Sequence, residues 1–254
     1  MKVYFLGTGT SQGIPVIGSN HEVCKSLNPK DKRLRVSVWV YTHNTSIVVD
    51  CGPDFRQQML ASKCTKIDAF LFTHEHADHT SGIDDIRPFN FRHGEIPLYA
   101  HSRVIENLKK RFDYVFETEN RYPGAPSVHA IEVKNNIPFI IGDIQIVPIN
   151  ASHANLQVFG FKMNDFAYLT DVKTIKSEEI EKIKGVKVLV INALREESHH
   201  SHFSLQEALD FVTLVQPEKA YFTHISHLLG FHVEVEKKLP SNVFLAYDNL
   251  EIAL

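Results

Sequence analysis

The strongest constraint on this chain is a loop dense in metal-binding side chains, directly after an apolar run. The run Ala69–Thr73 has the residue types of a buried strand, and His74-Glu75-His76-Ala77-Asp78-His79 follows it at once. A strand fixes the direction of its last side chains, and a tight loop then turns alternate residues toward one point. His74 and His76 can therefore share one ion, while Asp78 and His79 serve a second. The pattern predicts a metal-binding loop at the edge of a sheet.

Composition indicates an ordinary globular protein. The 254 residues are 43% hydrophobic and 22% charged, and 27 Lys and Arg against 30 Asp and Glu leave no basic excess for nonspecific binding to nucleic acid. No apolar run approaches the roughly 20 residues that span a bilayer, and the apolar start at Lys2–Leu6 reaches Gly7 too soon for a signal peptide. We therefore expect a cytoplasmic protein without a membrane partner. Three cysteines are too few for a disulfide framework, and the surplus of 15 histidines gathers in short clusters suited to metal chemistry.

The order of apolar runs predicts two sheets with helices outside. Short β-rich runs lie at 36–41, 46–49, 69–72, 139–141, 144–149, 158–162, 166–169, 188–191 and 219–222. Asp54 can cap a helix carrying Phe55, Met59 and Leu60, and Ser204–Glu207 is a capping box that opens a helix ending before Pro217. Strands in two batches, each followed by helices, favour face-to-face sheets over an alternating barrel. We expect one domain over 1–254, with 111–136 as a polar surface excursion.

Three further ligand candidates each follow an apolar strand. His153 follows the run 144–149, Asp171 follows 166–169, and His224 follows 219–222. Carboxyl ends of strands bring distant segments to one sheet edge, and a pair of ions needs a carboxylate able to bridge them. Any one of these residues alone could be an ordinary surface or core residue. Together with the loop, they predict a dinuclear site.

In this order, H-x-H-x-D-H followed by a histidine, an aspartate and a final histidine, the chain resembles the metallo-β-lactamase superfamily over nearly its whole length. The resemblance implies an α+β fold, a four-layer αββα sandwich. It implies that one ion is held by His74, His76 and His153 and the other by Asp78, His79 and His224, with Asp171 as the bridging, catalytic carboxylate. Asp50, after the run 46–49, matches the aspartate that the family places beneath the metal loop. An aspartate before Gly52 could equally form a turn.

Three segments are similar to the phosphodiesterase branch of this superfamily, and above all to the phosphoribosyl cyclic phosphate phosphodiesterases. They are 7–15, Thr223-His224-Ile225-Ser226-His227 and 245–250. That family binds a separate structural zinc, whose ligands align here with Ser19, His21, Cys24 and His227. Serine is a poor zinc ligand, so a three-ligand site completed by water and no site at all both stay open.

His202 lies before the capped helix, where the resembling family carries its catalytic histidine. The implied reaction is in-line attack of a metal-bridging hydroxide on a phosphodiester, with His202 protonating the leaving oxygen. His199, Arg87 and Arg195 could contact the phosphate, although the stretch 199–202 also reads as a polar loop and exposed arginines usually bind no ligand. The expected cofactors are two divalent ions, Zn²⁺ or Mn²⁺ and in some settings Fe²⁺, with an additional structural Zn²⁺ if the second site forms.

Other functions share this ligand order. tRNA 3′-processing endonucleases generally carry a long insertion between the aligned His153 and Asp171, which here lie only 18 positions apart, so nucleic acid is the less favoured partner and a small phosphodiester the preferred one. A thioester or β-lactam hydrolase could use the same core. A noncatalytic metal sensor is a third alternative, although a structural site needs only four ligands. The sequence is compatible with both a monomer and a homodimer.

Overall fold

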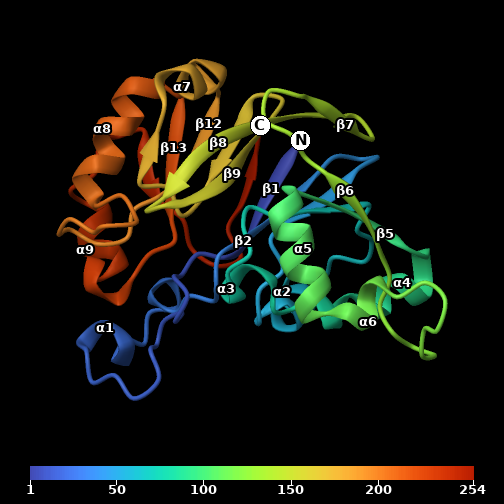
Figure 1. The fold of residues 1–254 in the computed structure, drawn as a ribbon. Helices are drawn as coiled ribbons and strands as arrows, with labels where there is room; N and C mark the ends of the chain where they lie inside the picture. Colours follow the sequence, from blue (N-terminus) through green and yellow to red (C-terminus); the bar gives the residue numbers. More distant parts are fainter.

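The computed structural model describes residues 1–254 as two β-sheets that face each other, with helices on both outer sides (Figure 1). The first sheet has seven strands in the order β15-β1-β2-β3-β4-β5-β6. Their bounds are β1 Lys2–Gly7, β2 Ser37–Tyr41, β3 Ser46–Val49, β4 Ala69–Leu71, β5 Ile96–Ala100, β6 Val128–Glu132 and β15 Glu251–Ala253. β3 to β6 are parallel to one another, so the loops that follow them leave the sheet at the same edge.

The second sheet has eight strands, with β11-β8-β9-β10-β12-β13-β14 in order and β7 paired to β8. Their bounds are β7 Phe139–Ile141, β8 Ile144–His153, β9 Leu156–Met163, β10 Phe166–Leu169, β11 Thr174–Ile175, β12 Val188–Asn192, β13 Lys219–Thr223 and β14 Val243–Leu245. β8 to β10 form an antiparallel meander, and β10, β12, β13 and β14 are parallel. β8 therefore runs parallel to β10 and ends at the same edge.

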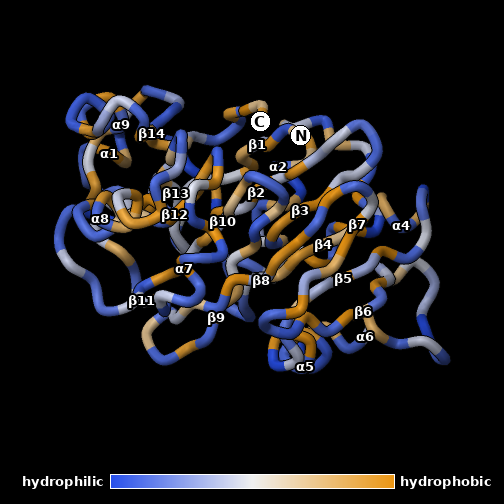
Figure 2. Tube along the Cα trace, turned by 90° about the horizontal axis from the view of Figure 1, so that it is seen from above, coloured by the Kyte–Doolittle hydropathy of each residue, from blue (hydrophilic) through white to orange (hydrophobic).

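Three apolar layers follow from the two-residue period of the strands. Val49 and Leu71 of the first sheet and Phe161 and Val190 of the second belong to the core between the sheets, whereas Val48 faces outward. This alternation puts one side of each strand against the opposite sheet and the other side against helices. In Figure 2 the central strands of both sheets are largely orange, as expected of strands buried on both faces.

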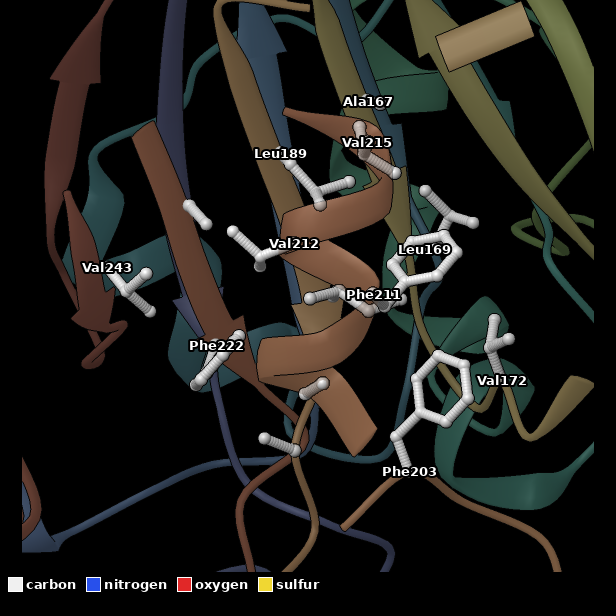
Figure 3. Packing of buried hydrophobic residues seen from close by; sticks show 14 of the residues in the cluster. Ala167, Leu169, Val172, Leu189, Phe203, Phe211, Val212, Val215, Phe222 and Val243 are labelled. Atoms are coloured by element: carbon white, nitrogen blue, oxygen red, sulfur yellow. The ribbon is translucent and has the colours of Figure 1, made fainter. Parts of the chain in front are cut away.

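Helices cover both outer faces and complete four layers. Over the first sheet lie α2 Phe55–Ser62, α3 Ala77–Thr80, η2 Ile83–Ile86, α4 Arg87–His93, α5 Ser102–Arg111 and α6 Asp113–Phe116. Over the second lie α7 Ser177–Ile183, α8 Leu205–Val215 and α9 His232–Glu236, with η3 His227–Leu229 nearby. Figure 3 shows Val212 and Val215 of α8 packed beside Leu189 and Leu169, with Phe203 near Val172. The expected α+β sandwich is confirmed.

A short arm at the lower left of Figure 1 extends from the sandwich and packs beside η3. It contains α1 Glu22–Lys25 and η1 Pro29–Asp31 and returns to the body through β2. No helix in the molecule has the length and apolarity that crossing a membrane requires.

The observed elements depart from expectation at three places. The stretch 111–136 is more than a surface excursion, because it contains α6 and β6, the edge strand of the first sheet. Asp54 precedes α2 but makes no side-chain cap, because its carboxylate pairs with Arg35 at 3.0 Å. Leu60 is 65% exposed rather than part of the apolar face of α2.

Candidate metal centre

The predicted ligands converge because their strands end at one edge. Asp50 follows β3, the 74–79 loop follows β4, His153 ends β8, Asp171 comes two residues after β10, and His224 follows β13. The backbone N–H of Phe159 donates to the Thr73 carbonyl at 3.0 Å, which joins β9 of the second sheet to the start of the loop. The site thus lies where the two sheets meet.

The backbone is unusual at three of these strand ends. Asp50, Asp171 and His224 have φ angles of 63°, 57° and 53°, in the left-handed region that non-glycine residues seldom adopt. Each such residue costs on the order of 1 kcal/mol relative to ordinary backbone, and persists only where the surroundings determine it. Each turn ends its strand abruptly and leaves the side chain within the cluster.

The side chains form three overlapping donor groups. Ligand atoms lie within 4.8 Å of one another in the groups His74–His79–Asp171, Asp78–His79–His224 and His153–Asp171–His202. The second group matches the ligand set predicted for one ion, and Asp171 takes part in both others, as a bridging carboxylate would. His76 is exposed and outside these groups, but its ring centroid lies 4.5 Å from that of His74 and 5.2 Å from that of His153.

Buried ring nitrogens without partners show that the cluster suits cations. Nε2 of His74, Nε2 of His79 and both ring nitrogens of His224 are buried and accept or donate no hydrogen bond. His79 Nε2 lies 3.2 Å from Asp171 Oδ2, and His224 Nε2 lies 3.3 Å from Asp171 Oδ1. Buried polar atoms are rarely left unpaired, and cations between imidazole and carboxylate donors would satisfy the Nε2 atoms of His74, His79 and His224. The residues present therefore fit divalent metal ions.

Neighbouring groups fix which nitrogen of each ring faces the cluster. His153 Nδ1 donates to the Ser201 carbonyl at 2.8 Å, and His79 Nδ1 donates to Asp50 Oδ2 at 2.7 Å. Both rings therefore turn Nε2 toward the cluster, which is the nitrogen that would bind a metal ion. Asp50 is fully buried and also accepts from Thr73 N–H at 2.9 Å, so its carboxylate lies beneath the loop as the resemblance implied.

The turn after Asp50 supports the loop through its backbone. Cys51 N–H donates to the His79 carbonyl at 2.7 Å, and the Gly82 N–H donates to the Cys51 carbonyl at 2.8 Å. A Cβ on Gly52 would lie 2.1 Å from the Asp78 carbonyl oxygen, so only glycine allows this approach. The backbone of Cys51 and Gly52 therefore holds the loop at a fixed distance from β3.

The electrostatics of the cluster keep Asp171 and His74 in the protonation states that bind metal. Burial would raise the pKa of Asp171, but His224 and His79 hold it well below its usual range. Burial, with the nearby His79, lowers the pKa of His74 well below that of an exposed histidine. Burial also opposes charge on His79, yet Asp78 and Asp171 outweigh it and raise that pKa. Ionised carboxylates and a neutral His74 are the states that bind metal, and a cation would displace the proton from His79.

His202 belongs to the same cluster. Its Nε2 lies 3.0 Å from Asp171 Oδ1, and its Nδ1 lies 3.0 Å from Ser201 Oγ and 3.2 Å from His199 Nδ1. Burial lowers the pKa of His202 to about 4, although Asp171 opposes the shift. The structure therefore brings His199 next to His202, and places His202 beside the candidate bridging carboxylate.

The two predicted arginine contacts are engaged elsewhere. Arg87 hydrogen-bonds Asp84 and, at 3.1 Å, the hydroxyl of Tyr122. Arg195 donates to the backbone carbonyls of Glu197 and Ser198 and so closes its own loop. Neither guanidinium contacts a candidate ligand, so their role toward a phosphate stays a prediction.

The second predicted metal site is assembled only in part. The rings of His21 and His227 lie 5.0 Å apart, since α1 packs beside η3. Cys24 Sγ accepts a hydrogen bond from Val16 N–H at 3.5 Å, and Ser19 Oγ accepts one from His21 N–H at 3.2 Å. These side chains are not among the compact donor groups of the protein, and a structural zinc here stays a prediction.

Sequence reasoning missed the groups that hold the ligands. Thr73 Oγ1 contacts both Asp50 and His74, and the Ser201 carbonyl orients His153. Arg103 and Arg111 bind the metal loop from α5. Thr73 could have been noticed because it adjoins the motif, but nothing in the sequence marks arginines about thirty residues away.

Comparison with known proteins places this site in a family. A family described as "Beta-lactamase superfamily domain" matches residues 45–225. A solved structure of a diphosphatase from the PhnP family is 34% identical, with a TM-score of 0.92 over 100% of this chain and 97% of that one. The chain belongs to the metallo-β-lactamase superfamily and, within it, to the PhnP-like phosphodiesterase branch. It is therefore a metal-dependent hydrolase by family.

Two other relatives extend the comparison. The structure of human tRNase Z, short form, has a TM-score of 0.70 over 100% of this chain and 99% of that one, but at 18% identity it shows the fold alone. A protein named octanoyltransferase from Porphyromonas gingivalis is 39% identical over 253 residues, which are 99% of this chain and 51% of that protein. The chain thus spans about half the length of this curated relative.

Proposed function

We propose that the protein hydrolyses small or cyclic phosphodiesters at a dinuclear metal site. The observation that carries the proposal is Asp171, whose carboxylate is shared between two groups of imidazole donors. His74, His76 and His153 would hold one ion and Asp78, His79 and His224 the other, with Asp171 between them. Two divalent cations at such a site would polarise a phosphoryl group and supply a nucleophile at neutral pH. The relation to a PhnP-family diphosphatase along the whole chain supports a phosphoryl substrate.

His202 is the group in the cluster suited to hold a proton for the leaving oxygen. Its burial lowers its pKa to about 4, so it is neutral at pH 7 before substrate binds. A negatively charged phosphodiester beside the ring would raise that pKa, because opposite charge favours the imidazolium. Ser201 and His199 flank the other ring nitrogen and set the orientation of the ring. His202 would thus be placed beside the reacting phosphoryl group to pass a proton to the leaving oxygen.

The structure gives little support to tRNA as the substrate. His153 and Asp171 are joined by the tight β8–β9–β10 meander, with no inserted arm to grip a tRNA. The basic stretch 30–35 is also engaged: Arg33 is buried and donates to Thr8 Oγ1 and the Ala246 carbonyl, and Arg35 pairs with Asp54. A small ligand suits this surface better than a polyanion.

Turnover of model substrates tests the proposal. Protein loaded with Mn²⁺ or Zn²⁺ should cleave bis(p-nitrophenyl) phosphate and members of a panel of cyclic, linear and diphosphate-linked nucleotides. His202→Ala should lower kcat by roughly 10² to 10⁴, the usual contribution of a positioned acid. His129→Ala, on the exposed edge strand β6, is the matched control and should leave kcat unchanged. Two bound metal equivalents without cleavage of any diester would contradict the proposal and favour a metal sensor.

A second candidate is hydrolysis of an acyl thioester, because the 39% identical relative carries the name octanoyltransferase. The same metal core can polarise a carbonyl as well as a phosphoryl group. Octanoyl thioesters therefore belong in the substrate panel. A kcat/KM for octanoyl thioester above that for every phosphodiester would reverse the order of the two candidates.

A further inference from the structure

Glu75 is the one residue of the metal loop whose carboxylate is turned away from the donor cluster toward a helix. Its Oε1 accepts from Arg103 Nε at 2.8 Å and its Oε2 accepts from Arg103 Nη2 at 3.1 Å. The pair is bidentate, a geometry that fixes direction as well as distance. Glu75 lies between His74 and His76, so the position of its backbone sets the position of both imidazoles.

The same guanidinium also reaches the second sheet. Arg103 Nη2 donates to the Gln157 carbonyl at 2.6 Å. Gln157 is in β9, opposite Ser152 of β8 in the hairpin that carries His153. One side chain therefore joins the loop that bears His74 and His76 to the hairpin that bears the third predicted ligand of the same ion.

Helix α5, which carries Arg103, is itself held in place by burial and by a capped start. Val104 and Leu108 are fully buried against the first sheet, and the His101 side chain accepts from Arg103 N–H to cap the helix. At the other end of the helix, Arg111 Nη1 donates to the Glu75 carbonyl at 2.9 Å and to Thr80 Oγ1 at 2.9 Å. Figure 1 shows α5 beside α3, which continues the metal loop.

We propose that Arg103 is a positioning residue of the metal centre, which sets the affinity of the ion held by His74, His76 and His153 by tying their two chain segments together. The inference rests on the metal-binding part of the proposed function and is independent of the substrate. Because Arg103 touches no ligand atom, its effect passes through Glu75 and Gln157.

Metal titration of the full-length apoprotein against a chromophoric chelator tests this role. Wild type should show the two Zn²⁺ binding steps of the dinuclear centre, and His153→Ala identifies the step that belongs to its ion. Arg103→Met and Glu75→Gln should each weaken that step by about 10- to 100-fold, as loss of groups that orient ligands usually does, while the other step stays within about threefold. The double variant should bind this ion no more weakly than Arg103→Met alone, since Arg103→Met already removes the contact with Glu75. Arg103→Lys, which keeps the charge without the fork, should recover only part of the affinity.

Lys2→Met is the matched control, because it breaks a long-range ion pair with Glu251 at 2.8 Å on the β1–β15 edge. It should leave both steps unchanged. The inference would be overturned if Arg103→Met weakened both binding steps equally or weakened neither, because a general loss of stability affects both ions alike. If Arg103→Met fails to fold, Glu75→Gln and Arg103→Lys decide the matter. A wild-type chain that binds no pair of ions would instead refute the dinuclear proposal itself.

Discussion

Asp50 shows how a residue outside the ligand set can govern the site. It is fully buried, it accepts from Thr73, and it fixes the His79 ring through Nδ1. We expect Asp50→Ala to weaken binding of the ion held by His79 by about 10- to 100-fold, because the ring loses the partner that sets its tautomer. Isothermal titration with Zn²⁺ measures this loss. Asp165→Ala, an exposed aspartate paired to Lys187 at the far end of β10, should bind as wild type does, and a normal affinity in Asp50→Ala would contradict the assignment.

Asp248 provides a pH-dependent contribution to stability. Burial raises its pKa to about 6, although Leu34 N–H and Thr8 Oγ1 donate to its carboxylate at 2.6 and 2.7 Å. With a folded pKa above the unfolded value of 3.8, the folded state binds the extra proton between about pH 4 and 6. The contribution is therefore fully present below pH 4 and is lost as pH rises to 6, by at most about 3 kcal/mol.

Urea unfolding of the apoprotein from pH 4 to 7 measures this effect. The unfolding free energy of wild type, relative to Asp248→Asn, should fall over that interval and level off above pH 6. A difference that does not change with pH would show that the carboxyl is ionised throughout.

At the residue scale, the spacing of the histidines and aspartates along the sequence explains which site residues could be predicted. The ligand candidates were visible because metal chemistry restricts residue type and because each candidate follows an apolar strand. Arg103 and the Ser201 carbonyl were not visible, because a guanidinium on a helix or a backbone oxygen in a loop has no sequence mark until the fold brings it near.

At the scale of elements, α8 links local sequence to the site. Ser204 Oγ accepts from Glu207 N–H, and Glu207 Oε2 accepts from Ser204 N–H at 2.8 Å, so the predicted capping box is present two residues after His202. We expect Ser204→Ala to lower the free energy of unfolding by about 1 kcal/mol, because an N–H of the first turn loses its partner. Urea unfolding measures it, with exposed Ser241→Ala as a control expected to be neutral. A loss of stability shared equally by both variants would rule out the cap as its cause.

The elements that the sequence did not reveal have physical reasons for being hidden. β5 contains Pro97, which usually argues against a strand inside a sheet. β6 has an edge position and mixed polarity, so its apolar alternation is weak. The central strands were visible because burial on both faces leaves long apolar runs. These short segments become strands because they pair with neighbouring strands, and their own sequence pattern does not predict them.

At the scale of the whole molecule, bound metal should stabilise the sandwich, since the ligands come from both sheets. Ions that bind only the folded state at about a thousand times their Kd contribute roughly 4 kcal/mol, which for a chain of this size raises Tm by about 10 °C. Differential scanning calorimetry with and without chelator measures the shift. His79→Ala, which removes a donor shared by two groups, should show a much smaller shift, and equal melting with and without chelator in wild type would contradict a metal-bridged fold.

The left-handed backbone at Asp50, Asp171 and His224 lowers the stability of the chain at three positions whose side chains the site needs. Glycine adopts this conformation without strain, so glycine there would relax the chain while removing the side chain. A library of variants selected only for resistance to heat, in the absence of metal, should therefore accumulate glycine at these turns and lose its chemistry. The same library selected for turnover should retain all three residues.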